Sequence, residues 1–210
     1  MTWNSSATAS TIRRSVAKQG GLTVRWLPSL LLGAAVAAAH AKDCKGVTLP
    51  DRVQVSGTDL TLNGLGVRKA TFLKINVYVA GLYVVRPSQD ANTLIQSDGP
   101  QELILHFVRN VGVDDLRKAW REGFERVTQN QLAPFETRIA TLNGWMADVK
   151  TGERLQFVRQ AHGGIEVSVA GKVRGTLQGE DFARAFLAIW LGATPPNTEL
   201  KTGLLGGECN

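Results

Sequence analysis

The sequence predicts an α+β domain in which helices pack on one face of a large antiparallel sheet. Apolar stretches of strand-like composition lie at residues 65–73, 76–85 and 103–109, and three shorter stretches of period two follow between residues 154 and 177. Between and after them, apolar residues recur every three or four positions, the period of an amphipathic helix. Such helices must bury their apolar stripes, and the strands offer the only surface large enough, so we expect the helices to cover one sheet face.

The segment at residues 76–85 is the expected central strand. It holds mainly Val, Tyr, Leu and Ala and no charged residue, which suits a strand buried on both faces. The short junction at Lys74 and Ile75 predicts a tight turn from an antiparallel neighbour at residues 65–73. The remaining expected strands are residues 47–55, 59–62, 103–109, 154–160, 164–170 and 172–177.

Three amphipathic helices are expected. The first begins near an Asp114 cap and carries its apolar stripe to Val127. The second follows Pro134, and the third opens at Gly179 and ends at Gly192. Residues 90–97 are expected to be a helix or a loop, and residues 197–205 a last short helix.

The first 41 residues are expected to be a signal peptide, followed by one domain at residues 42–210. The early part carries four basic residues and no acidic one, and an apolar core of about a dozen residues precedes Ala39-His40-Ala41, a signal peptidase pattern. This core is too short to cross a bilayer comfortably, which takes about 20 residues. We therefore expect secretion to the periplasm and no stable membrane span after cleavage.

Composition limits the partners of the mature domain. The whole chain has 24 basic and 18 acidic residues, but the four basic residues of the leader reduce the mature net charge to about +2. No Lys/Arg stripe with interleaved aromatic residues occurs, so nucleic-acid binding is not expected. There is no metal-ligand spacing of Cys and His, and no cofactor or metal is expected. Oligomeric state is not predicted.

Two cysteines remain after cleavage, Cys44 and Cys209, at opposite ends of the domain. In an oxidising compartment such a pair most simply forms a disulfide that ties the termini together. A lipid-modified Cys44 is disfavoured, because Ala41-Lys42-Asp43 is not the apolar and small sequence that lipidation requires. In the chain-entropy model, closing so long a loop stabilises the fold by about 4 to 5 kcal/mol.

Arg68 is the oddly placed charge of the sequence, expected in the middle of a sheet. Gly64 and Gly66 precede it, and without Cβ atoms they allow a ligand or another segment of the chain to approach closely. A guanidinium in such a place needs a partner, because burying it unpaired costs several kcal/mol. On the residues alone, we favour pairing with a carboxylate of the protein, or contact with solvent. His106 is interpreted as a core or sheet-face histidine.

Several segments resemble the chalcone isomerase family in the family's order, and they span nearly the whole mature chain. They are Gly66-Val67-Arg68, Ala80-Gly81-Leu82-Tyr83, the strand and helix between residues 103 and 127, and the helix end at residues 186–192. The likeness is to the exported bacterial branch rather than to the plant flavonoid enzymes. It implies an open-faced β-sandwich with a ligand cleft between sheet and helices.

The resemblance also assigns roles to residues. In the plant enzymes, the arginine that matches Arg68 stabilises a phenolate that attacks an enone. The family's catalytic threonine matches Tyr78, and its late-helix threonine falls near Ile189. Residues 112–120 contain neither the tyrosine nor the asparagine expected there. Without these polar groups the network that holds a ketone oxygen is missing, so we expect the isomerase activity to be lost.

Three functional hypotheses remain open. The leading one is a non-catalytic periplasmic protein that binds an amphipathic carboxylate, such as a fatty acid, through Arg68; the resemblance includes a branch that does this. Tyr78 either adds a second hydrogen bond or is a buried core tyrosine, depending on the turn register. The enzyme alternative is an intramolecular lyase that acts on a phenolic enone with Arg68 and Tyr78. The third is an envelope protein-interaction module whose cleft is filled by its own side chains.

Overall fold

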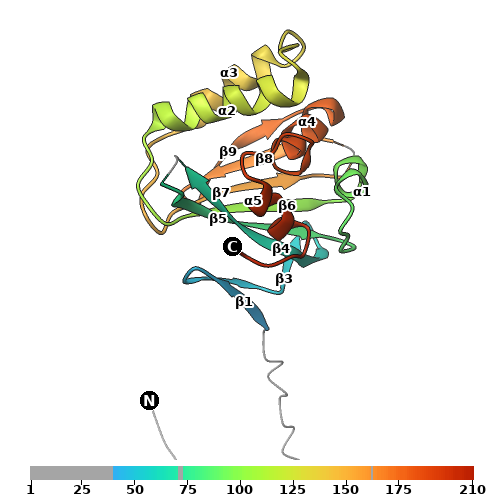
Figure 1. The fold of residues 1–210 in the computed structure, drawn as a ribbon. Coiled ribbons are helices and arrows are strands. Elements are labelled where there is room, and N and C mark those ends of the chain that lie inside the picture. Colours follow the sequence, from blue (N-terminus) through green and yellow to red (C-terminus); the bar gives the residue numbers. More distant parts are fainter. Residues whose placement is uncertain (1–39, 71–72, 162) are drawn as a thin grey trace, which may run out of the picture. The chain divides into compact units, whose positions relative to one another are not determined.

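Seven strands form one antiparallel sheet in the computed structural model, which describes residues 40–70, 73–161 and 163–210. Their spatial order follows the chain order, so every strand pairs with its neighbour in the sequence. The predicted sheet is confirmed (Figure 1). The strands are β3 (Arg52–Val55), β4 (Thr58–Ala70), β5 (Ile75–Val84), β6 (Gln101–Phe107), β7 (Arg154–Arg159), β8 (Ile165–Val169) and β9 (Lys172–Leu177).

The described part of the chain has five helices, which bury their apolar sides in a shared core with one face of this sheet; the predicted covering of one face by the amphipathic helices is confirmed. In Figure 1, α2 and α3 run along the top. An aromatic cluster at the centre of the core joins Trp120 and Phe186 from two helices to Phe157 of β7. The helices are α1 (Ala91–Gln96), α2 (Val113–Thr128), α3 (Glu136–Trp145), α4 (Glu180–Leu191) and α5 (Thr198–Leu204).

The opposite face of β4, β5 and β6 carries a second, smaller core that the sequence analysis did not foresee. A separate hairpin of β1 (Ala41–Cys44) and β2 (Val47–Pro50) covers it. The Tyr83 hydroxyl donates a hydrogen bond to the Pro50 carbonyl at 2.9 Å. The expected disulfide is present: it joins Cys44 to Cys209, 165 positions away, with 5.9 Å between their Cα atoms. The C-terminal tail is thereby fastened to the β1–β2 hairpin.

The glycines before Arg68 accommodate a helix. A Cβ atom on Gly64 would overlap the carbonyl oxygen of Gly203, and one on Gly66 would overlap that of Leu200. Both carbonyls belong to α5, which packs directly on β4. The close approach expected at these glycines is therefore made by a segment of the same chain, and the start of α5 comes to lie beside Arg68.

Three boundary predictions were wrong. The strands expected at 59–62 and 65–73 form one long strand, β4, because an irregularity between Leu62 and Gly64 absorbs the break. The strand expected at 47–55 is divided between β2 and β3, which belong to different sheets. Helix α2 is capped at Gly112 rather than Asp114, because the Asp148 side chain already accepts the Val113 N–H at 2.8 Å.

The predicted signal peptide covers residues 1–41, and residues 1–39 lie outside the part that the structure describes. This prediction therefore stays a prediction. Among the described helices, none is both long and apolar enough to span a bilayer. The described residues also contain no cluster of His, Cys, Asp and Glu side chains arranged to hold a metal ion.

Candidate ligand-binding cleft

A cavity of about 750 Å³ lies between the helix-facing side of β4–β6 and helices α2 and α4. Small-molecule sites usually measure about 300 to 1,000 Å³ and have mostly apolar walls with a few polar groups. This cavity matches that description, and it is the space the sequence analysis expected beside Arg68. Its wall includes the apolar side chains of Val77, Leu105, Phe107, Leu116, Trp120 and Ile189.

Arg68 lines the cavity without a carboxylate partner. Its Nη1 donates to the Asn197 Oδ1 at 3.0 Å and to the Lys69 carbonyl, and both acceptors are neutral. No Asp or Glu of the described residues lies within ion-pair distance of Arg68, and residues 1–39, 71–72 and 162 contain no acidic side chain. Of the two alternatives expected from the residues alone, the carboxylate partner is therefore not found, whereas Arg68 is partly exposed and so keeps contact with solvent. Nε and Nη2 have no acceptor among the described residues.

The position of Arg68 also differs from the prediction. It lies near the end of β4 rather than in the middle of the sheet. Strand β3 pairs with β4 only as far as Thr61, so β3 does not cover the edge of β4 beside Arg68. The outer edge of β4 beside Arg68 instead meets Asn197, the N-cap of α5. The Asn197 Oδ1 accepts both the Arg68 guanidinium and the Lys69 backbone N–H, the latter at 2.9 Å. One amide oxygen thus fixes the guanidinium to the strand.

Tyr78 lies directly across from Arg68 in the β4–β5 ladder, so both side chains are on the helix-facing side. The ladder shifts by one residue just after Arg68, an irregularity that the sequence does not reveal. The Tyr78 hydroxyl oxygen accepts a hydrogen bond from the Trp190 indole Nε1 at 3.0 Å. Its own proton has no acceptor among the described residues, so it is available to a ligand.

The phenol of Tyr78 is held in its neutral form. Burial raises the pKa of Tyr78 above 10, while the Trp190 hydrogen bond and the charges of Arg68 and Arg126 oppose the rise in part. A neutral phenol donates a hydrogen bond well and accepts a proton poorly. Arg68 and Tyr78 together therefore present N–H and O–H donors to the same space.

The cavity rim is basic, and we use "basic rim" for Arg109, Lys118 and Arg126. Lys118 is 3.9 Å from Glu122, whereas Arg109 and Arg126 have no ion-pair partner among the described residues. The acidic side chains at the rim are Asp115 and Glu122. With Arg68 included, positive charges outnumber negative ones, which favours an anionic ligand.

The polar groups that would hold a ketone oxygen are scarce. Ile189 and Leu116 are apolar wall residues at or near the positions where the resemblance places catalytic polar groups. Asn110 also lines the cavity, but its amide oxygen accepts the Thr151 backbone N–H at 2.9 Å. The Trp120 indole N–H is buried and has no acceptor among the described residues. Trp120 is thus a buried wall donor that adds to those of Arg68 and Tyr78.

His106 does not contribute to the cleft. It is half-buried on the opposite sheet face, where its Nδ1 accepts a hydrogen bond from the Arg154 Nε at 3.0 Å. Burial, and secondly the positive charge of Arg154, lower the pKa of His106, so the imidazole is neutral. The interpretation of His106 as a sheet-face histidine is confirmed.

Comparison with known proteins agrees with this architecture. The crystal structure of a fatty-acid binding protein from Arabidopsis thaliana superimposes with a TM-score of 0.64 at 15% sequence identity, covering 79% of this chain and 96% of that one. No curated protein sequence matches this chain. A family model described as chalcone isomerase-like matches residues 41–206. The chain therefore belongs to the chalcone isomerase-like family.

Proposed function

We propose that this protein binds an amphipathic carboxylate such as a fatty acid without transforming it, and that Arg68 and Tyr78 hold the head group. The observation that carries the proposal is the guanidinium of Arg68 at the wall of a largely apolar cavity: among the described residues it has no charged partner, and its Nε and Nη2 have no acceptor. A carboxylate takes two parallel N–H bonds from such a fork. The apolar wall then receives the acyl chain.

The structural neighbour supports this assignment in a general way. It is a fatty-acid binding protein with the same fold. At 15% identity, the comparison supports a shared architecture and gives no information on individual contacts. The neutral phenol of Tyr78 fits the role of a hydrogen-bond donor to a carboxylate oxygen. The basic rim adds a field that attracts anions to the entrance.

We also propose that the protein works in the periplasm after removal of residues 1–41. The basic start and the apolar core of this segment support export. The disulfide between Cys44 and Cys209 fits an oxidising compartment. Mass spectrometry of the protein recovered from a periplasmic fraction tests the proposal: a mature chain beginning at Lys42 is expected, and a retained leader contradicts it.

The two other hypotheses receive less support. An intramolecular lyase needs groups that hold a ketone oxygen, and the wall near Leu116 and Ile189 is apolar. A filled cleft is at odds with a cavity of about 750 Å³ beside Arg68. Chalcone absorbance decay in the presence of protein tests the lyase. An acceleration over the spontaneous rate that is lost in Arg68→Ala would favour the enzyme.

A binding experiment with a matched control tests the proposal. The affinity for a fluorescent fatty acid is measured for the wild type, Arg68→Ala and Arg174→Ala, and native mass spectrometry with oleate counts the bound molecules. Arg174 is an exposed arginine of β9, at the opposite edge of the sheet from β3, and it is not among the residues that line the cavity. Loss of a charge-assisted hydrogen-bond pair weakens binding by about 10- to 150-fold in Arg68→Ala, and Arg174→Ala is expected to bind like the wild type. Equal loading of all three proteins overturns the proposal.

A further inference from the structure

The turn between β4 and β5 exposes apolar side chains next to residues that line the cavity. We use "hairpin tip" for Leu73, Lys74 and Ile75. Leu73 is 64% exposed and Ile75 is 38% exposed, two of the four large hydrophobic residues that the described chain leaves in water. Lys74 between them is also exposed. Leu73 keeps most of its apolar surface in water and Ile75 keeps more than a third, so a surface that covers the turn would bury both.

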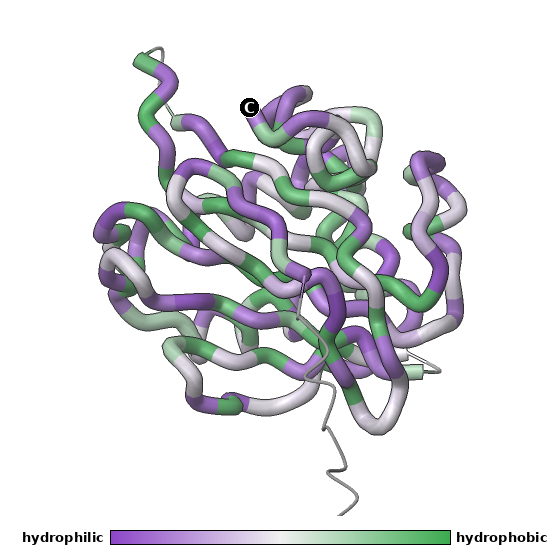
Figure 2. The backbone as a smooth tube through the Cα atoms, turned by 90° about the horizontal axis from the view of Figure 1, so that it is seen from below, coloured by the Kyte–Doolittle hydropathy of each residue, from purple (hydrophilic) through white to green (hydrophobic). Residues whose placement is uncertain are grey.

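The hairpin tip stands apart from the rest of the sheet. Strand β6 pairs with β5 only from Tyr78 onward, and β3 pairs with β4 only up to Thr61. The end of the hairpin therefore has no strand neighbour within the described chain. Figure 2 shows it standing out at the upper left, with apolar and polar positions alternating.

Residues at the base of the same arm line the cavity. Ala70 and Ile75, on either side of the turn, both line the cavity, together with Arg68. The basic rim lines the same space, so the apolar tip and the unpaired charges of Arg109 and Arg126 belong to one continuous region. Apolar side chains flanked by basic ones match an anionic phospholipid surface, where the apolar groups enter the acyl boundary and the cations meet head groups.

We propose that the hairpin tip docks on anionic lipid bilayers, and that the ligand passes between the bilayer and the cavity beside this tip. The proposal rests on the proposed function for the identity of the ligand, but the docking itself does not need a bound ligand. A membrane is the natural source of an acyl chain, since a free fatty acid in water exposes its whole apolar surface. The field of the rim falls off within about 10 Å in 0.1 M salt, so docking is expected to weaken with salt.

A site-specific label tests the docking in the absence of any fatty acid. The described chain has no free cysteine, so Leu73→Cys can carry one environment-sensitive fluorophore. Val173→Cys on β9 is the matched control, because Val173 is also 64% exposed. With vesicles of phosphatidylglycerol and phosphatidylcholine, the emission at position 73 shifts to the blue and that at position 173 does not. This comparison within one chain is independent of residues 1–41, whose apolar core can itself contact lipid.

Unlabelled variants measure the strength of docking by vesicle co-sedimentation. Leu73→Asp weakens vesicle binding at least about tenfold, Lys74→Gln weakens it about fivefold, and Val173→Asp has no effect. Equal shifts of both labels, no shift at position 73, or a shift that occurs on concentration without vesicles overturns the proposal; the last result identifies self-association. An equal response to pure phosphatidylcholine overturns the role assigned to the basic rim.

Ligand transfer separates this inference from the proposed function. If both hold, Leu73→Asp slows the uptake of a fluorescent fatty acid from vesicles but leaves its affinity in solution unchanged. If vesicle binding depends on position 73 while no fatty acid binds in solution, the proposed function fails and the docking surface stands. If fatty acid binds in solution and no variant of the hairpin tip changes uptake from vesicles, the docking proposal fails and the proposed function stands.

Discussion

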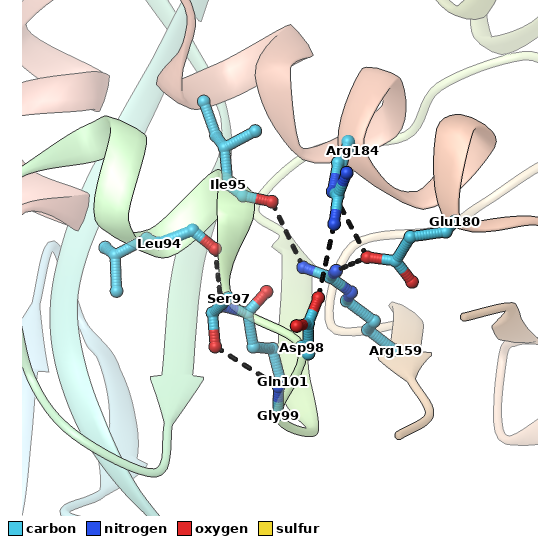
Figure 3. A network of polar contacts seen from close by, with 9 residues as sticks. All are labelled: Leu94, Ile95, Ser97, Asp98, Gly99, Gln101, Arg159, Glu180 and Arg184. Atoms are coloured by element: carbon cyan, nitrogen blue, oxygen red, sulfur yellow. Dashed lines mark hydrogen bonds and ion pairs between the residues drawn. The ribbon is translucent and has the colours of Figure 1, made fainter. Parts of the chain in front are cut away.

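Arg68 and Arg159 are two strand arginines on the helix-facing side of the same sheet, and they differ in whether a carboxylate of the protein neutralises them. Arg159 of β7 is 2% exposed and donates to the Glu180 carboxylate and, at 3.2 Å, to the Ile95 carbonyl (Figure 3). Arg68 of β4 lines a cavity and donates only to neutral oxygens. The buried guanidinium of Arg159 is neutralised by a carboxylate of the protein, whereas that of Arg68 has no carboxylate partner among the described residues.

The network around Arg159 shows what neutralisation requires. Glu180 lies between two guanidinium groups, those of Arg159 and Arg184, and Arg184 continues to Asp98 at 3.2 Å (Figure 3). Burial lowers the pKa of Arg159, while the negative charge of Glu180 acts in the opposite direction. Helix α1, strand β7 and helix α4 are thereby joined at one corner of the sheet. The described residues place no such ionic network around Arg68, which has the amide of Asn197 and the phenol of Tyr78 nearby instead.

The largest expected effect comes from removing the carboxylate that neutralises Arg159. Glu180→Ala leaves a buried guanidinium without its charged partner, so the unfolding free energy falls by about 3 to 5 kcal/mol. Urea unfolding followed by circular dichroism measures this change. Replacing the pair together, as Arg159→Met with Glu180→Leu, is expected to recover most of the loss, because it leaves no unpaired charge. A loss of unfolding free energy below about 1 kcal/mol in Glu180→Ala would mean that Arg159 needs its carboxylate partner no more than Arg68 does.

The second effect concerns affinity rather than stability. Arg68→Met lowers the free energy of fatty-acid binding by about 2 to 3 kcal/mol, because the charge-assisted hydrogen bonds to the carboxylate are lost. Its unfolding free energy changes by less than about 1 kcal/mol, since no carboxylate of the protein is left unpaired. Calorimetric titration and urea unfolding of the same preparation give both numbers. A large loss of stability in Arg68→Met would show that Arg68 is a structural residue like Arg159.

A third, smaller effect is expected at Asn197. Asn197→Ala removes the neutral acceptor that fixes Arg68 to β4, so the guanidinium loses orientation but keeps its charge. Fatty-acid affinity is expected to fall about fivefold, the value of one hydrogen bond of about 1 kcal/mol. Thr198→Ala, at the next and exposed position of α5, is the control and should bind like the wild type. Equal affinities for all three proteins would show that Arg68 needs no positioning.

The sequence predicted the layers of the fold and the unusual placement of Arg68, but not the pairing of Arg159. Arg68 was recognisable because a charge within an apolar strand is unusual, and the paired helices were recognisable by their period. The pairing of Arg159 with Glu180 was not, because it depends on where the start of α4 meets β7 in space. The β1–β2 hairpin on the opposite face was also missed, since the sequence does not show that residues 47–55 divide between two sheets.

The contacts that set the geometry of the cleft come from distant segments. Trp190 meets Tyr78 across 112 positions and Asn197 meets Arg68 across 129. In the sequence Trp190 was only a member of an apolar stripe, and Asn197 only the start of a short helix. The register shift after Arg68 decides that Tyr78 faces the cavity, and neither strand shows it in its composition. Strand and helix types follow from local pattern, whereas such contacts follow from packing.

The smallest expected effect tests whether the charge of Arg68 reaches Tyr78. The chain has only two tyrosines, so Tyr83→Phe leaves Tyr78 as the single phenol to titrate by near-ultraviolet absorbance. Burial raises the pKa of Tyr78, and the charge of Arg68 opposes this. Adding Arg68→Met to Tyr83→Phe is therefore expected to move the titration to higher pH, whereas Arg174→Ala is expected to leave it in place.

The raised pKa of Tyr78 also makes the unfolding free energy fall at alkaline pH. An unfolded chain releases the tyrosine proton near pH 10, whereas the folded chain retains it to higher pH. The stabilising contribution of the neutral phenol is full below about pH 10 and is lost as the pH rises from there through the folded-state pKa. In the Tyr83→Phe background, adding Tyr78→Phe should flatten this alkaline fall of the unfolding free energy. A fall that is unchanged would mean that Tyr78 titrates in the folded chain as it does in water, and that its hydroxyl faces solvent rather than a closed wall shared with Arg68.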